Sequence, residues 1–212
     1  MNTEHKQMLE FVKEKLYAGG KDITDGKYQS FRSRYGHTKR VLNWCKRLCG
    51  AYGGVVNEYV LYVSAIFHDV GYAASYEESD IPHAEASARI FEDYCSKHEV
   101  PFAAEISRNI SLHSDKALLK REDTPIELIL LMEADLLDET GALSIVFDCM
   151  TSGERRLDSY EAAYERIRRY SCMELEDAPM VTPEAIRIMK EKKELVKAFV
   201  RSLEIDLNIG EG

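Results

Sequence analysis

Apolar residues recur at intervals of three and four along most of the chain, which is the period of an amphipathic helix. One such stripe covers residues 8–16 and another covers residues 41–48. Residues 55–67 are apolar on nearly every side, and their Val, Tyr and Ile content also suits a strand. The length of this run and its small residues Ser64 and Ala65 favour a buried central helix. Neither period-two alternation nor alternating strands and helices stand out, so the pattern predicts an all-α fold.

Several helix boundaries are marked by their own residues. Helices are expected at residues 83–98 and 101–113. The sequence TPIE at residues 124–127 has the form of a capping box with proline at the first helical position, and it predicts a helix to about residue 139. The sequence TPE at residues 182–184 predicts a C-terminal helix in the same way. The apolar residues expected along that last helix are Ile186, Met189, Leu195, Phe199 and Leu203.

The chain has 212 residues, of which 45% are hydrophobic, so it can bury a full core. Because domains commonly have about 100 to 200 residues, we expect one domain over residues 1–212. Residues 151–155 and 171–181 are expected to be irregular but are short for domain linkers. The helices of residues 155–207 should therefore pack on the same body. Tyr160, Tyr164 and Ile167 either pack inward or form a homodimer contact.

The charge of the chain restricts its partners. A net charge of -9 and a pI near 5.3 argue against nucleic-acid binding through a broad basic face, although a small phosphorylated ligand needs only a local cluster of cations. The first 16 residues mix charges with apolar residues, unlike a signal peptide, and no segment approaches the roughly 20 apolar residues of a membrane span. The five cysteines include no C-x-x-C pair, which favours reduced thiols and a cytoplasmic protein. Cys45 and Cys49 are expected to be small buried residues rather than a metal pair.

Four of the six histidines occupy positions where a helical stripe would otherwise carry a hydrophobic residue: His37, His68, His83 and His113. Asp135 lies inside the run LILLMEADLL, where an unpaired buried charge would cost several kcal/mol. A divalent cation would compensate that charge and explain the buried imidazoles. Any one of these histidines is more often an ordinary core residue, but the whole set, spread over separate helices, predicts a metal site.

The two remaining histidines serve as controls. His5 and His98 stand among charged neighbours, and both are expected to be solvated surface residues.

In order and spacing, these residues resemble the H…HD…H…H…D motif of the HD superfamily of metal-dependent phosphohydrolases. The resemblance covers about residues 30–150 and is carried by GHTKRVLNWC, AIFHDVGY, PHAEASARIF, ISLHSD and EADLLDETGALS. It implies a helical bundle of the HD-domain type with additional C-terminal helices. It also implies four primary metal ligands, namely His37, His68, Asp69 and Asp135. His83 and His113 match positions that bind either a second metal or a substrate phosphate, and both alternatives stay open.

The resemblance implies a hydrolase that cleaves a phosphoester or phosphoanhydride bond of a small phosphorylated metabolite. A nucleotide is the favoured substrate, and the expected nucleophile is a metal-bound hydroxide. Nucleotidase-like members often carry HDxxE, whereas Tyr72 occupies the acidic position here, which favours a triphosphate or polyphosphorylated nucleotide over a monophosphate. The mixed nitrogen and oxygen ligands suit Mn, Fe, Co or Ni, with one or two ions per chain.

Further residues have candidate roles around such a site. Asp138 is expected to hold a ligand or a water molecule, or else to be an exposed carboxylate. His83 or His113 would protonate the leaving oxygen if neither binds metal, and residues 71–82 would form a polar lid. The candidate phosphate-binding cations, each with a solvated surface charge as the alternative, are Lys116, Lys39 and Arg40.

Two other classes of function are compatible with the same ligands. One is a non-catalytic regulatory module that binds a metal or a nucleotide, and the other is an oxygenase with two irons. A hydrolase is favoured because the ligand set is intact.

Overall fold

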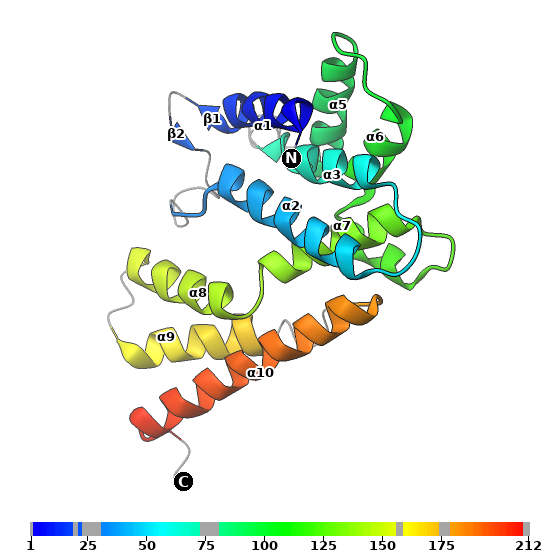
Figure 1. Ribbon diagram of the computed structural model, residues 1–212. Coiled ribbons are helices and arrows are strands. Elements are labelled where there is room, and N and C mark those ends of the chain that lie inside the picture. The colour runs from blue at the N-terminus through cyan, green and yellow to red at the C-terminus, as the bar shows by residue number, and fades with distance from the viewer. Residues whose placement is uncertain are drawn as a thin grey trace.

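The computed structural model describes residues 2–18, 21–22, 31–72, 81–155, 159–173 and 179–209. These residues confirm the all-α prediction (Figure 1). Their helices are α1 (Thr3–Leu16), α2 (Arg34–Ala51), α3 (Glu58–Phe67), α5 (His83–Cys95), α6 (Ala103–Leu112), the 3-10 helix η1 (Lys116–Lys120), α7 (Ile126–Asp138), α8 (Ala142–Glu154), α9 (Tyr160–Arg166), the π-helix η2 (Ile167–Met173) and α10 (Pro183–Asp206). The strands β1 (Tyr17–Ala18) and β2 (Lys21–Asp22) form a short antiparallel pair. In the part of the chain described, no helix is long and apolar enough to cross a membrane.

The central helix of the fold is α3, which packs against α1, α2, α5, α6 and α7. The prediction of a buried helix here is confirmed, but α3 begins at Glu58 rather than near residue 55. The side chain of Asn57 caps the helix by accepting a hydrogen bond from the Val60 backbone nitrogen at 3.3 Å. An N-cap residue has non-helical backbone angles, so the helix cannot extend back past Asn57. Val55 precedes this cap and lies outside the helix, where it is 94% exposed.

A second layer, formed by α8, α9 and α10, lies beneath α2 and α7 in Figure 1. The long helix α10 connects the two layers, because Ile188 and Met189 belong to the main core. Farther along α10, Val196 packs with Tyr164 and Ile167 in a separate apolar cluster. Tyr164 and Ile167 therefore pack inward, as one of the two alternatives predicted, whereas Tyr160 is exposed.

The capping box predicted at residues 124–127 is wrong, although α7 begins within two residues of the expected position. Thr124 donates its hydroxyl hydrogen to the Leu118 carbonyl at 2.6 Å instead of capping the helix. Glu127 accepts a hydrogen bond from the Asn57 backbone nitrogen at 2.7 Å, which connects the start of α7 to the start of α3. Thr124 and Glu127 therefore bond to other segments of the chain instead of to each other's backbone at the start of α7.

The start of α10 at Pro183 is confirmed, and the apolar residues expected along it are in the helix, but most of them are not on its buried face. Ile186, Leu195 and Phe199 are exposed hydrophobic side chains. The buried face is rotated around the helix and consists of Ala185, Ile188, Met189, Val196 and Val200. A long amphipathic helix that contacts two separate clusters does not need one continuous stripe.

Three further predictions are corrected. Residues 151–154 belong to α8 rather than to an irregular segment, because Thr151 and Ser152 lie on the buried side of that helix. His5 is only 7% exposed, because it shares the buried face of α1 and lies against the rings of Tyr59 and Tyr62. Residues 171–173 lie in η2, and most of the predicted lid, residues 73–80, lies outside the described residues.

Candidate metal centre

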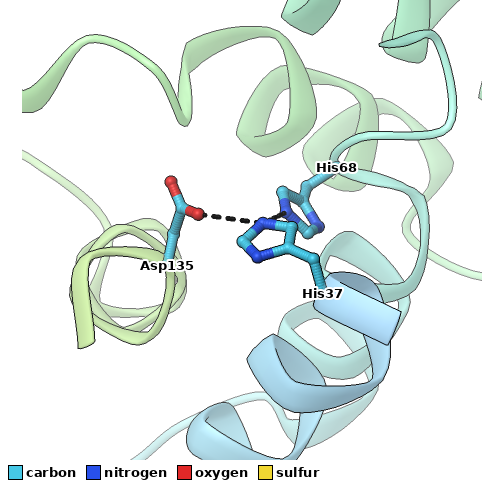
Figure 2. A group of neighbouring side chains, drawn as sticks. All are labelled: His37, His68 and Asp135. Atoms are coloured by element: carbon cyan, nitrogen blue, oxygen red, sulfur yellow. Dashed lines mark hydrogen bonds and ion pairs between the residues drawn. The ribbon is translucent and has the colours of Figure 1, made fainter. Parts of the chain in front are cut away.

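Five helices bring the predicted ligands together. His37 lies in the first turns of α2, whereas His68 and His113 follow the last residues of α3 and α6. His83 begins α5, and Asp135 lies in the last turns of α7. Figure 2 shows His37, His68 and Asp135 pointing toward one another from α2, the end of α3 and α7. Packed helices hold side-chain geometry more firmly than loops do, which suits a metal site.

The ligand atoms form a tight group around His37. Its Nε2 atom lies 3.2 Å from His68 Nε2, 3.2 Å from Asp135 Oδ1 and 3.5 Å from Asp69 Oδ2. The distance from His68 Nε2 to Asp69 Oδ2 is 3.7 Å. Two donors that bind one ion at right angles, each about 2.1 Å from it, are about 3 Å apart. The spacing therefore fits adjacent positions around one transition-metal ion.

Hydrogen bonds at Nδ1 fix the tautomers of three imidazoles. His68 donates from Nδ1 to the Ala65 carbonyl at 2.8 Å, and His113 does the same to the Ile110 carbonyl at 2.7 Å. His37 donates from Nδ1 to Asp138 Oδ2 at 2.8 Å. Each ring consequently turns Nε2 toward the centre, as metal-binding histidines with a hydrogen-bonded second nitrogen do.

Asp69 lies between two sets of imidazoles. Its Oδ2 atom faces His37 and His68, and its Oδ1 atom lies 3.5 Å from His83 Nε2 and 3.6 Å from His113 Nε2. The side chains form two groups of three whose ligand atoms lie within 4.8 Å of one another and can hold a metal ion, namely His37, His68 and Asp135, and His68, Asp69 and His113. His68 belongs to both groups, so the two candidate metal positions are adjacent.

Arg34 is a residue of the centre that the sequence did not reveal. Its buried guanidinium donates to Asp69 Oδ2 at 3.0 Å, and its Cζ atom lies 3.4 Å from the centroid of the Tyr72 ring. Arg34 precedes His37 by three residues and so lies on the same face of α2. That spacing was the available signal, but an arginine at the start of a helix is usually exposed.

The predicted cations fall into three different places. Lys116 lies at the centre, where its Nζ atom donates to Asp135 Oδ2 at 2.7 Å and to the His113 carbonyl at 2.9 Å. Arg40 contacts Asp138 with two hydrogen bonds of 2.8 and 3.0 Å and thereby fixes the carboxylate that holds His37. Lys39 lies elsewhere, exposed on α2 with its Nζ atom 4.7 Å from the Tyr35 ring centroid.

Charges within the cluster keep the two carboxylates Asp69 and Asp135 ionised. Burial opposes ionisation of Asp69, but His68, His113, His37 and Arg34 outweigh it and hold the carboxyl pKa well below its usual range. Burial likewise opposes charge on Asp135, and Lys116 and His37 keep its pKa well below normal.

The two central histidines differ in protonation. Burial opposes charge on His37, yet hydrogen bonds with Asp135 and Asp138 raise its pKa to about 9. Burial lowers the pKa of His68 to about 4. At neutral pH His37 is therefore protonated and His68 is neutral, so a cation that binds both Nε2 atoms would have to displace a proton from His37.

The chain belongs to the HD-domain family, whose model matches residues 34–140. Membership supports metal-dependent phosphohydrolase chemistry in general. No curated protein matches the sequence.

Solved structures share the fold at low sequence identity. A predicted HD-superfamily hydrolase from an uncultured Thermotogales bacterium has a TM-score of 0.64 and 19% identity over 95% of this chain and 92% of its own. Bacillus subtilis YpgQ in complex with ADP has a TM-score of 0.62 and 16% identity over 96% of this chain and 94% of its own. An HD-superfamily hydrolase from Bacillus thuringiensis has a TM-score of 0.62 and 18% identity, covering 97% of each chain.

Proposed function

We propose that this protein is a metal-dependent phosphohydrolase that acts on a small phosphorylated metabolite, with a nucleotide as the favoured substrate. The observation that carries the proposal is the arrangement of three imidazoles, each fixed at Nδ1 and turned with Nε2 toward ionised carboxylates. Such an arrangement is costly without a cation and suits one well. Residues 1–212 would form one domain in which α8, α9 and α10 pack on the HD-type bundle.

His37, His68, Asp69 and Asp135 would hold the first ion. Mixed nitrogen and oxygen donors suit Mn, Fe, Co or Ni. When bound, such an ion supplies Lewis-acid chemistry, because it lowers the pKa of a coordinated water and polarises a phosphoryl oxygen. His83 and His113 either bind a second ion through the Asp69 Oδ1 side or contact the substrate phosphate.

The chain's own residues supply the remaining parts of a phosphoryl-transfer site. Lys116 and Arg34 place positive charge beside the two carboxylates, where it counters the charge of phosphate oxygens. His83 is partly exposed, and its Nε2 atom lies 3.0 Å from Ser114 Oγ. It is therefore the better placed of the two candidate histidines to give a proton to a leaving oxygen, since His113 is buried.

Two observations support a nucleotide. YpgQ, a protein of the same fold, has been solved in complex with ADP. The acidic residue of the HDxxE pattern is replaced by Tyr72, whose ring stacks on Arg34 rather than presenting a carboxylate. This replacement favours nucleoside triphosphates and polyphosphorylated nucleotides over monophosphates.

A hydrolysis screen tests the proposal. Protein loaded with Mn²⁺ is incubated with nucleoside mono-, di- and triphosphates, and phosphate and pyrophosphate release are both measured. Asp69→Ala should abolish turnover, whereas Asp93→Ala, which changes an exposed carboxylate on α5, should leave it unchanged. No turnover across the panel from protein shown to hold metal would instead favour a regulatory module that binds a metal or a nucleotide.

A further inference from the structure

A second candidate site lies beside the metal centre, in a cavity of about 450 Å³. Residues 31–33, the C-terminal end of α7, α8 and the segment around η2 form its walls. None of the six predicted metal-binding residues is among the described residues that line it, but Asp138 and Arg40 are. The cavity is therefore separated from His37 by the Asp138 carboxylate. Its volume falls within the range of small-molecule sites.

The walls carry aromatic rings and guanidinium groups that contact one another. The rings of Phe31 and Phe147 meet edge to face with centroids 5.6 Å apart. The Arg32 guanidinium lies 5.3 Å from the Phe147 ring centroid, and the Arg166 guanidinium lies 4.5 Å from that of Tyr170. Planar groups of this kind stack on a planar aromatic ligand without a change of backbone.

The apolar part of the lining comes mainly from α8. Leu143, Val146 and Met150 are exposed hydrophobic side chains spaced three and four residues apart, so they share one face of the helix. This face borders the cavity instead of packing into either neighbouring core cluster. A bound ring would remove that apolar surface from water.

Among the described residues that line the cavity, positive and negative side chains occur in equal numbers. Arg32 pairs with Glu139, and Arg40 pairs with Asp138 at 2.8 Å. Arg166 pairs with Asp148 at 2.9 Å. Within the described lining, three arginines against three carboxylates leave no surplus positive charge to attract a phosphate. The pairs instead offer both donors and acceptors, which suit the edge of a neutral heteroaromatic ring.

We propose that this cavity binds a purine or pyrimidine ring, as a nucleoside-sized site separate from the metal centre. The faces of the ring stack on Phe147 and Tyr170, and the arginine–carboxylate pairs form hydrogen bonds with its edge. The choice of nucleobases among heteroaromatic rings rests on the proposed function. The cavity and its lining are present whether or not the protein hydrolyses nucleotides.

Binding of uncharged nucleosides tests this site without any contribution from phosphate or metal. Adenosine, guanosine, cytidine and uridine are titrated into the full chain in the presence of a chelator, with isothermal titration calorimetry and saturation-transfer NMR as readouts. Val146→Trp fills the cavity from a position that is 51% exposed. Ile186→Trp is the matched control, since Ile186 is 48% exposed on α10 and is not part of the described lining.

At least one nucleoside should bind the wild type, and Val146→Trp should raise its Kd at least tenfold. Phe147→Ala removes a stacking ring without adding volume and should raise the Kd about fivefold or more. Ile186→Trp and Asp135→Ala should leave the Kd unchanged. The inference is overturned if no nucleoside binds or if both cavity variants bind normally. It is equally overturned if Asp135→Ala abolishes binding, because the ring would then lie at the metal centre.

Discussion

Loading the centre with a divalent metal should raise the thermal stability of the protein by a predictable amount. The first-ion ligands come from α2, from the end of α3 and from α7, so the complete set exists only in the folded chain. A ligand that binds only the folded state at 100 times its Kd adds about 2.7 kcal/mol to the free energy of unfolding. For a chain of this length, 1 kcal/mol corresponds to about 2 to 4 °C in Tm. Chelated protein should therefore gain roughly 5 to 10 °C when Mn²⁺ is added.

Asp135→Ala isolates the contribution of the site to this shift. The variant should fold, because each partner of the removed carboxylate keeps another one: His37 retains Asp138, and the partly exposed Lys116 retains the His113 carbonyl. Thermal unfolding is followed by circular dichroism with and without metal, and bound metal is measured by elemental analysis. The variant should lose most of the shift, and Asp93→Ala should retain it. An equal shift in Asp135→Ala and wild type would refute the reasoning, because the ion would then bind elsewhere.

Three further substitutions test a contact at the metal centre and two contacts between helices around it. Arg34→Lys keeps a positive charge but loses the planar stacked guanidinium that orients Asp69, and it should weaken metal affinity about 10- to 100-fold in a metal titration. Glu133→Ala leaves two backbone N–H groups and a hydroxyl at the start of α10 without their acceptor, and it should lower the free energy of unfolding by about 3 kcal/mol in urea. Gly71→Ala would bring a Cβ atom against the Ser87 backbone nitrogen of α5 and should cost about 1 to 3 kcal/mol in the same assay. Unchanged metal affinity in the first variant, or unchanged stability in the other two, would contradict these contacts.

Three of the proposed ligand histidines could be picked out from the sequence because each interrupts a regular apolar pattern. His37 and His113 continue buried stripes of α2 and α6, and His68 ends an almost wholly apolar helix. A polar residue in such a position requires a partner, and this requirement is visible without knowledge of the fold. The surface position predicted for His5 was wrong because it was judged from its charged sequence neighbours, whereas His5 lies on the buried face of α1 against the rings of Tyr59 and Tyr62.

Other features depend on contacts between distant segments and could not be predicted. The role of Glu127 is set by Asn57, 70 residues earlier in the chain, so a local capping pattern gave the wrong partner. The buried face of α10 depends on which residues of α8 and α9 it meets. The only sequence signal for Arg34 was its spacing from His37. Its burial follows from contacts with Asp69 and Tyr72 on another segment.

The most direct test of the account is nucleotide hydrolysis measured against the number of metal ions bound. Metal-free protein is titrated with Mn²⁺, and bound metal and phosphate release are recorded for the same samples of wild type, Asp69→Ala and Asp135→Ala. The account predicts that turnover rises with bound metal, reaches a plateau at one or two ions per chain and is absent in both variants. Turnover that is independent of bound metal, or that persists in variants unable to bind it, would contradict a metal-dependent phosphohydrolase.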